Sequence, residues 1–202
     1  MPYSIVYCDQ HFIAVSKPHR MLSVPGLSEP LNLFDELKRS FPNIRTIHRL
    51  DMATSGLILF ALSYDAQRAI SRQFELKIVH KTYVALVHGK VAANIIDISL
   101  PLAAHPSLKT RHTVAFNHGK SAQTVMQKLA ASDQYSRVLL HPLTGRSHQL
   151  RVHCSHIGHP IVGDPFYGDG NEANRLMLHA QSIRLQHPVT CAELTLNSPC
   201  PF

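Results

Sequence analysis

The chain has 202 residues, 45% of them hydrophobic, and its 20 Lys and Arg exceed its 13 Asp and Glu, which gives a formal net charge of +7. This length is enough for one domain with a proper core, and the lack of any apolar stretch near the roughly 20 residues of a membrane helix argues against a membrane protein. The positive charge favours a polyanionic partner, and because the first residues do not have the pattern of a secretory leader we expect a cytoplasmic protein.

The first part of the chain predicts a hairpin, two helices and a buried strand. Residues 5–8 and 12–15 alternate like strands on either side of a polar turn. The spacing of apolar residues predicts helices over 31–41 and 65–77. Between the helices, the apolar run 57–62 is typical of a strand with both faces buried.

The middle of the chain predicts mostly strands. Residues 81–89 alternate, which places Tyr83 on one face of a strand, where core or cross-strand packing is its ordinary role. Residues 90–110 have weak periodicity and are expected to form a strand and a surface loop. Three more segments are expected to form an antiparallel meander: 111–116, 123–130 and 136–141.

A third helix is predicted for residues 146–157, with Thr144 as its N-cap. Its buried stripe is predicted to consist of Leu150, Cys154 and Ile157. Its polar face is predicted to consist of Ser147, Arg151 and Ser155. A turn-rich loop over 163–170 and strands over 176–185 and 190–196 follow.

Asp51 is an isolated acid between basic and apolar neighbours. It lies just before the turn-prone Thr54, Ser55 and Gly56 and the buried strand that follows them. A carboxylate in this place is held by a rigid element and can stay open to a groove, which is the geometry of a functional site. The alternative is an acid that pairs with Arg49 or caps a turn.

No metal or cofactor is predicted. His153, His156 and His159 recur at intervals of three, but this spacing rotates successive side chains around a helix, and Pro160 ends the pattern. The sequence contains no Walker loop and no GxGxxG segment for a nucleotide cofactor. The four cysteines are scattered and form no CxxC pair.

Several ordered segments of the chain together resemble the RluA family of pseudouridine synthases. They are His48-Arg49-Leu50-Asp51, Thr54-Ser55-Gly56, Lys81-Thr82-Tyr83-Val84-Ala85, Leu143–His153, Gly158-His159-Pro160-Ile161 and Gly163-Asp164. The similarity extends from about residue 4 to about residue 196, and the loop 22–26 is closest to the dual-specificity type, which acts on large-subunit ribosomal RNA and tRNA anticodon stem-loops.

The resemblance implies a fold class and a domain organisation. We expect an α+β catalytic fold, with a mixed, mostly antiparallel sheet flanked by helices and loops around a central cleft. Residues 1–202 are expected to form a single catalytic domain without the S4-like domain that precedes it in many relatives. A monomer is expected.

The resemblance also implies an enzyme, an isomerase that converts uridine to pseudouridine without a metal or a cofactor. Asp51 is implied to be the essential carboxylate, either as a nucleophile or as the base that removes a sugar proton. Arg151 is implied to stabilise the charge of Asp51, and Tyr83 is implied to stack on the flipped uracil.

The expected partner is RNA, either ribosomal RNA or a tRNA stem-loop. Arg49 is implied to contact the RNA or to fill the space that the flipped base leaves, and a plain phosphate contact is its alternative. The further candidates for RNA contacts are His48, Lys17, Arg20, Lys109, Arg111 and Lys120.

Two other functions remain as alternatives. A non-catalytic RNA-binding or ribosome-assembly protein would use the same basic cleft, and its RNA affinity would not depend on Asp51. A histidine-rich metallohydrolase would contain bound metal and lose activity with a chelator.

Overall fold

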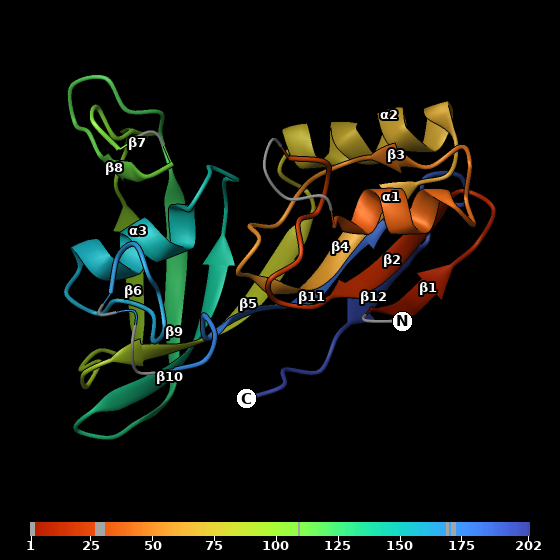
Figure 1. Cartoon of the computed structure of the whole chain (residues 1–202). Helices are drawn as coiled ribbons and strands as arrows, with labels where there is room; N and C mark the ends of the chain where they lie inside the picture. The colour runs from red at the N-terminus through yellow and green to blue at the C-terminus, as the bar shows by residue number, and fades with distance from the viewer. Residues whose placement is uncertain (1–2, 27–30, 109, 169, 171–172) are drawn as a thin grey trace. The chain divides into compact units, whose positions relative to one another are not determined.

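The computed structural model in Figure 1 describes residues 3–26, 31–108, 110–168, 170 and 173–202. The chain divides into two compact units. Unit 1 consists of residues 1–81 and 179–201, and unit 2 consists of residues 82–178 and residue 202. The single domain expected for residues 1–202 stays a prediction, and each unit is described in turn.

The strands of unit 1 form a mixed sheet. Its strands lie in the order β1 (Ser4–Cys8), β2 (Phe12–Lys17), β4 (Ser55–Ala61) and β11 (Leu178–Gln186). The short β3 (Arg45–Thr46) pairs with β4, and β12 (Glu193–Asn197) pairs with β11. Only β4 and β11 run parallel among these pairs. The predicted hairpin and the predicted buried strand are both confirmed.

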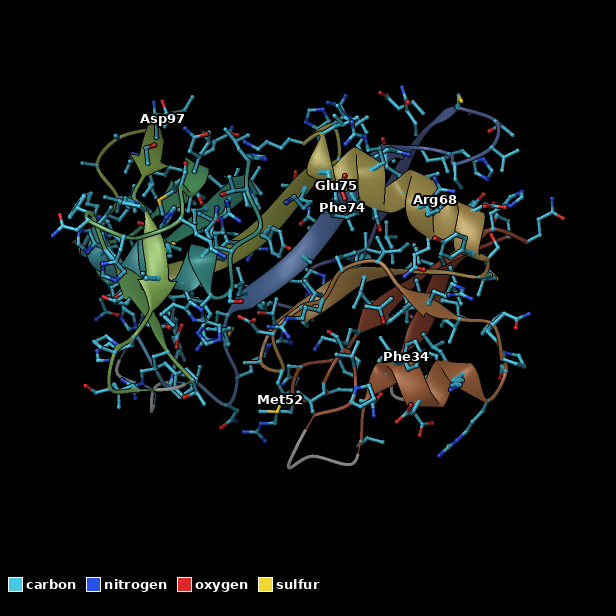
Figure 2. All side chains as sticks on the ribbon, turned by 90° about the horizontal axis from the view of Figure 1, so that it is seen from above. Phe34, Met52, Arg68, Phe74, Glu75 and Asp97 are labelled. Atoms are coloured by element: carbon cyan, nitrogen blue, oxygen red, sulfur yellow. The ribbon has the colours of Figure 1, made fainter. Side chains whose placement is uncertain are left out.

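The two helices of unit 1 pack on opposite sides of β4. Helix α2 (Tyr64–Glu75) places Ile70 in the same core cluster as Leu57 and Leu59. Helix α1 (Leu33–Lys38) contacts the other face, where the rings of Phe34 and Phe60 lie 6.2 Å apart. Figure 2 shows the two helices on either side of these strands. Strand β4 is buried at every residue because both of its faces are covered.

Gly56 allows β4 and β11 to approach each other closely. Its φ of +110° lies in a region that favours glycine, and it pairs with Ala180 of β11. A Cβ at this position would lie 2.2 Å from the carbonyl oxygen of Ala180. The glycine therefore fixes the start of β4, which directly follows the loop that carries Asp51.

The main sheet of unit 2 is antiparallel. Its strands lie in the order β5 (His80–His88), β10 (Tyr135–Pro142), β9 (Gln123–Ala131) and β6 (Ile95–Ser99). Strand β5 crosses from the end of unit 1 into unit 2, with most of its residues in unit 2.

The predicted meander is wrong in one strand. Strand β8 (His112–Val114) pairs with β7 (Leu102–Ala104) in a separate two-stranded sheet instead of joining β9. After β8 the chain returns to β7, where Leu102 and Lys120 exchange two backbone hydrogen bonds. The residues around β8 therefore pair with β7, which is close in the sequence, and not with β9. The prediction that β9 and β10 are antiparallel neighbours is confirmed.

Helix α3 (Gln149–His156) begins three residues later than predicted. Thr144 is not its N-cap, because His148 has this position with a left-handed φ of 54° and makes no capping hydrogen bond through its side chain. The Thr144 hydroxyl instead donates to Oε1 of Gln149 at 2.7 Å. Gln149 in turn donates to Thr124 of β9 at 3.0 Å, so side chains fasten the start of α3 to the sheet.

Together, the three helices and mostly antiparallel strands of the described residues confirm the predicted α+β class. None of the helices in this part of the chain has the length and hydrophobicity to cross a bilayer.

Candidate active site

Asp51 lies in the loop that connects β3 to β4 in unit 1. Its side chain is half-buried, and its backbone carbonyl accepts a hydrogen bond from the N–H of Thr54 at 3.1 Å. This turn leads directly into the fully buried β4. The carboxylate is therefore carried at the end of a rigid core strand, as the sequence predicts.

Three side chains tie this loop to the rest of unit 1, one of them from the loop itself. The backbone N–H of Leu59 in β4 donates to Nε2 of His48 at 3.0 Å. The hydroxyl of Ser23 bonds to both backbone polar groups of Leu50. The ammonium of Lys17 donates to the carbonyl of Met52 at 3.2 Å. The backbone is thus held on both sides of Asp51.

His48 is a neutral acceptor in this arrangement. Burial and the nearby charge of Lys81 lower the pKa of His48 to about 3. Its ring centroid lies 4.9 Å from that of Phe74, and the Lys81 ammonium lies 5.9 Å from the same phenyl ring. The structure thus assigns His48 to anchoring the loop, and an RNA contact through it stays a prediction.

Lys17 requires a correction. It was predicted to contact RNA, but it is only 1% exposed. Its ammonium also donates to the carbonyls of Pro18 and Met21, at 2.9 and 2.8 Å. It donates a further hydrogen bond to the carbonyl of Met52. Lys17 therefore supports the fold of the loop and does not present its charge to a ligand.

The remaining RNA candidates differ in their exposure. Arg49, Arg20 and Lys120 are exposed. Arg111 is half-buried, donates to the carbonyl of Phe166 at 3.0 Å, and holds its guanidinium 5.1 Å from that ring. Lys109 lies outside the described residues.

Tyr83 lies on β5 in unit 2, where it pairs with Leu140 of β10. Its side chain is half-buried. This strand position fixes the direction of the ring because side chains alternate between the two faces of a sheet.

Arg151 is buried because a loop covers the face of α3 that is predicted to be polar. It is only 3% exposed. Its Nε donates to Oδ2 of Asp164 and its Nη2 donates to Oδ1, both at 2.7 Å. The rings of Phe166 and Tyr167 each lie 5.1 Å from Cζ of Arg151. The polar face is thus covered by the loop that carries these three residues.

Asp164 is a site residue that sequence reasoning missed. It is completely buried, and its Oδ1 also accepts hydrogen bonds from the backbone N–H groups of Phe166 and Tyr167. The signal was available, because an acid directly follows Gly163 in a turn-rich loop that also contains two aromatic residues. The sequence does not say which cation this acid would meet.

His153, the first residue of the histidine series, has protein partners at both of its ring nitrogens. His153 is buried, with Nδ1 at 2.9 Å from Thr124 Oγ1 and Nε2 at 3.0 Å from the carbonyl oxygen of Leu100. Burial lowers the pKa of His153 and favours its neutral form. Within the part of the chain that the structure describes, no three His, Cys, Asp or Glu residues are grouped to hold a metal ion.

The arrangement provides groups for acid-base or nucleophilic chemistry. Asp51 supplies a carboxylate on a fixed loop, and Arg151 supplies a guanidinium whose orientation Asp164 fixes. A guanidinium has five N–H donors, and Asp164 accepts hydrogen bonds from two of them. Because Asp51 belongs to unit 1 and Arg151 and Tyr83 belong to unit 2, their pairing and the cleft between them stay predictions.

The chain is similar to known proteins over nearly its full length. The sequence model of the RNA pseudouridylate synthase family matches residues 11–156. The dual-specificity RNA pseudouridine synthase RluA of Vibrio vulnificus (strain CMCP6) is 41% identical over 98% of this chain and 83% of its own length. The protein of the same description from Escherichia coli (strain K12) is 41% identical over 98% of this chain and 93% of its own length.

A solved structure gives the same result for the fold. The human RNA pseudouridylate synthase domain containing 1 protein matches with a TM-score of 0.84 and 34% identity, over 99% of this chain and 84% of that chain.

Proposed function

The chain belongs to the RNA pseudouridylate synthase family, and we propose that it isomerises uridines in folded RNA with Asp51 as the essential carboxylate. The observation that carries this assignment is the family match, which includes Asp51, together with the three anchors that fix the loop around it. Such an enzyme is an isomerase.

The reaction explains why an acid without a cofactor is sufficient. The glycosidic bond from N1 to the sugar breaks, the uracil turns, and a bond from C5 to the same sugar carbon forms. The proton on C5 leaves and N1 gains one, so no atoms are gained or lost. The carboxylate of Asp51 assists this exchange either as a nucleophile or as a base towards the sugar.

Arg151 and Tyr83 are proposed to complete the active site. A guanidinium beside Asp51 would keep the carboxylate charged when bound RNA excludes water. The bidentate contact with Asp164 supports this role because it holds the guanidinium in one orientation. Tyr83 would stack on the uracil after the nucleotide leaves its helix, at a cost of a few kcal/mol.

Exposed basic residues are proposed to bind the RNA backbone. The chain carries an excess of seven positive charges, and phosphate contacts with release of counterions would supply much of the affinity. Arg49, Arg20 and Lys120 are exposed and suit this role. Phe116, which is 72% exposed and lies four residues before Lys120, offers a ring on which an unpaired base can stack.

We further propose the substrates and the setting. The relatives from Vibrio vulnificus and Escherichia coli are described as dual-specificity enzymes, which supports both ribosomal RNA and tRNA stem-loops as substrates. A cytoplasmic monomer fits this role.

The test is the Asp51→Asn variant, which keeps the shape of the side chain and removes its charge. We expect the single-turnover rate of pseudouridine formation on a tRNA anticodon stem-loop to fall by more than about 10³-fold, with RNA affinity within about two-fold of wild type. Asp133→Asn is the matched control, since its side chain is 91% exposed and pairs only with Lys90 in the described contacts. A fully active Asp51→Asn protein would contradict the role proposed for Asp51, whereas no turnover by the wild type, with equal RNA affinity in the variant, would favour an RNA-binding protein without catalysis.

A further inference from the structure

Ser23 makes two hydrogen bonds to one residue of the loop that carries Asp51. Its Oγ accepts from the backbone N–H of Leu50 at 3.0 Å and donates to the backbone carbonyl of Leu50 at 2.8 Å. Both polar groups of a buried residue are thus satisfied by a single hydroxyl. The two residues are 27 positions apart in the chain.

Ser23 is itself firmly held. Its backbone carbonyl accepts a hydrogen bond from the N–H of Phe34 at 3.2 Å, and the carbonyl of Leu22 accepts one from the N–H of Leu33 at 2.8 Å. These N–H groups belong to the first turn of α1, which has no partners for them within the helix. Ser23 is also only 3% exposed. Through this hydroxyl, the backbone of Leu50 is held in a fixed position relative to the start of α1.

The carbonyl carbon of Leu50 is bonded directly to the backbone nitrogen of Asp51. This carbonyl and the N–H of Asp51 lie in one rigid peptide plane. A hydrogen bond that fixes the oxygen therefore also fixes the plane from which the Asp51 side chain departs. The hydrogen bond to the N–H of Leu50 holds this residue at a second atom, so the backbone cannot rotate about the bond to its carbonyl.

We propose that Ser23 is a positioning residue for Asp51, so that loss of its hydroxyl slows catalysis without weakening RNA binding. The proposal rests on the proposed function of Asp51. A reacting group must be held close to its productive geometry, and a displacement of about 1 Å can cost about 10²-fold in rate. Ser23 touches neither the carboxylate nor the substrate in this proposal, and it acts through the backbone of Leu50.

The alternative is that Ser23 only stabilises the fold, and the chain contains a matched control for it. Ser136 on β10 makes the same two kinds of bond, although to two different residues: its Oγ accepts from the N–H of Val91 and donates to the carbonyl of Gly89, each at 2.8 Å. It is fully buried and belongs to unit 2. Ser136→Ala therefore removes the same chemistry from a place that does not carry Asp51.

The experiment compares Ser23→Ala with Ser136→Ala by single-turnover rate, RNA affinity and thermal unfolding midpoint. For Ser23→Ala we expect the rate per folded molecule to fall by at least about 10-fold, with an RNA dissociation constant within about two-fold of wild type. Amide hydrogen exchange at Leu50 should become faster, because its N–H loses its acceptor. For Ser136→Ala we expect the wild-type rate per folded molecule despite a lower midpoint.

Two further variants keep the test decisive. Ser23→Thr retains a hydroxyl and should recover most of the lost rate. Ser23→Cys keeps the size of the side chain but has only a weak donor, so it should be slow. It replaces Ser23→Ala in the comparison if that variant does not fold. A rate for Ser23→Ala or Ser23→Cys equal to that of Ser136→Ala would overturn the proposal. An active Asp51→Asn protein would instead overturn the proposed function, whatever the result at Ser23.

Discussion

Arg151 and Asp164 form a bidentate ion pair in which both donor-acceptor distances are 2.7 Å and both side chains are buried. Replacing a buried pair of this kind with apolar residues is often neutral for stability, so its main effect here is orientation. The planar guanidinium donates two hydrogen bonds from one edge to Asp164 and lies near the rings of Phe166 and Tyr167. A cation held in this way needs little reorganisation when a substrate binds.

The first prediction concerns removal of the charge from this pair. Asp164→Asn should lower the free energy of unfolding by about 3 kcal/mol, because Arg151 then keeps its buried charge without the carboxylate. Urea unfolding measures this change. Asp97→Asn is the control: Asp97 is exposed on β6 (Figure 2), so the change should be below about 0.5 kcal/mol. If both variants unfold like the wild type, the pair does not have the structural importance inferred here.

A second prediction concerns the close approach of β4 and β11. Gly56→Ala should lower the free energy of unfolding by about 3 kcal/mol or more, since the new Cβ meets the Ala180 carbonyl and the backbone keeps an unfavourable φ. Gly145→Ala is the comparison, because a Cβ there meets no atom within 4 Å. Chemical denaturation of the two variants separates these cases, and equal stabilities would refute the steric argument.

The third prediction concerns acid stability through Asp9. Burial tends to raise the pKa of Asp9, but hydrogen bonds from the Phe12 N–H, His187, Tyr7 and the His11 N–H outweigh it and lower the pKa to about 2. The unfolded value is about 3.9, so the folded state favours the charged form. The resulting stabilisation is present above about pH 4 and is lost as the pH falls towards 2.

Asp9→Asn should therefore cost on the order of 2 kcal/mol at pH 7, and its difference from wild type should shrink steadily between pH 4 and about pH 2. Urea unfolding of both proteins across this range gives the difference directly. Asp133→Asn, an exposed acid, should show no such trend. A difference for Asp9→Asn that stays constant with pH would show that packing, and not charge, is responsible.

The sequence predicted the core of unit 1 well because a single local pattern determines it. The run that forms β4 is apolar at successive residues, and only burial on both faces accommodates such a run. The same reasoning placed Asp51 in the turn just before the first residue of this strand. Family motifs, rather than periodicity, supplied the expected roles of Tyr83 and Arg151.

The errors arise where distant segments decide the outcome. Helical spacing placed Arg151 on a polar face, but it does not show that the loop around Asp164 covers this face. Lys17 appeared to be available for RNA because the carbonyl of Met52, which accepts a hydrogen bond from its ammonium, lies 35 positions away. Threonine is a residue type that commonly caps helices, but the hydroxyl of Thr144 donates to the side chain of Gln149 instead.

The enclosure of Lys17 has a practical consequence for studies of the loop. Amine-directed reagents modify exposed lysines within the folded protein, but they reach the ammonium of Lys17 only when its carbonyl partners separate. Acetylation at this residue therefore marks molecules in which the segment around Met52 has opened. The peptide that contains Lys17 can thus report, by mass spectrometry, how often the loop that carries Asp51 opens.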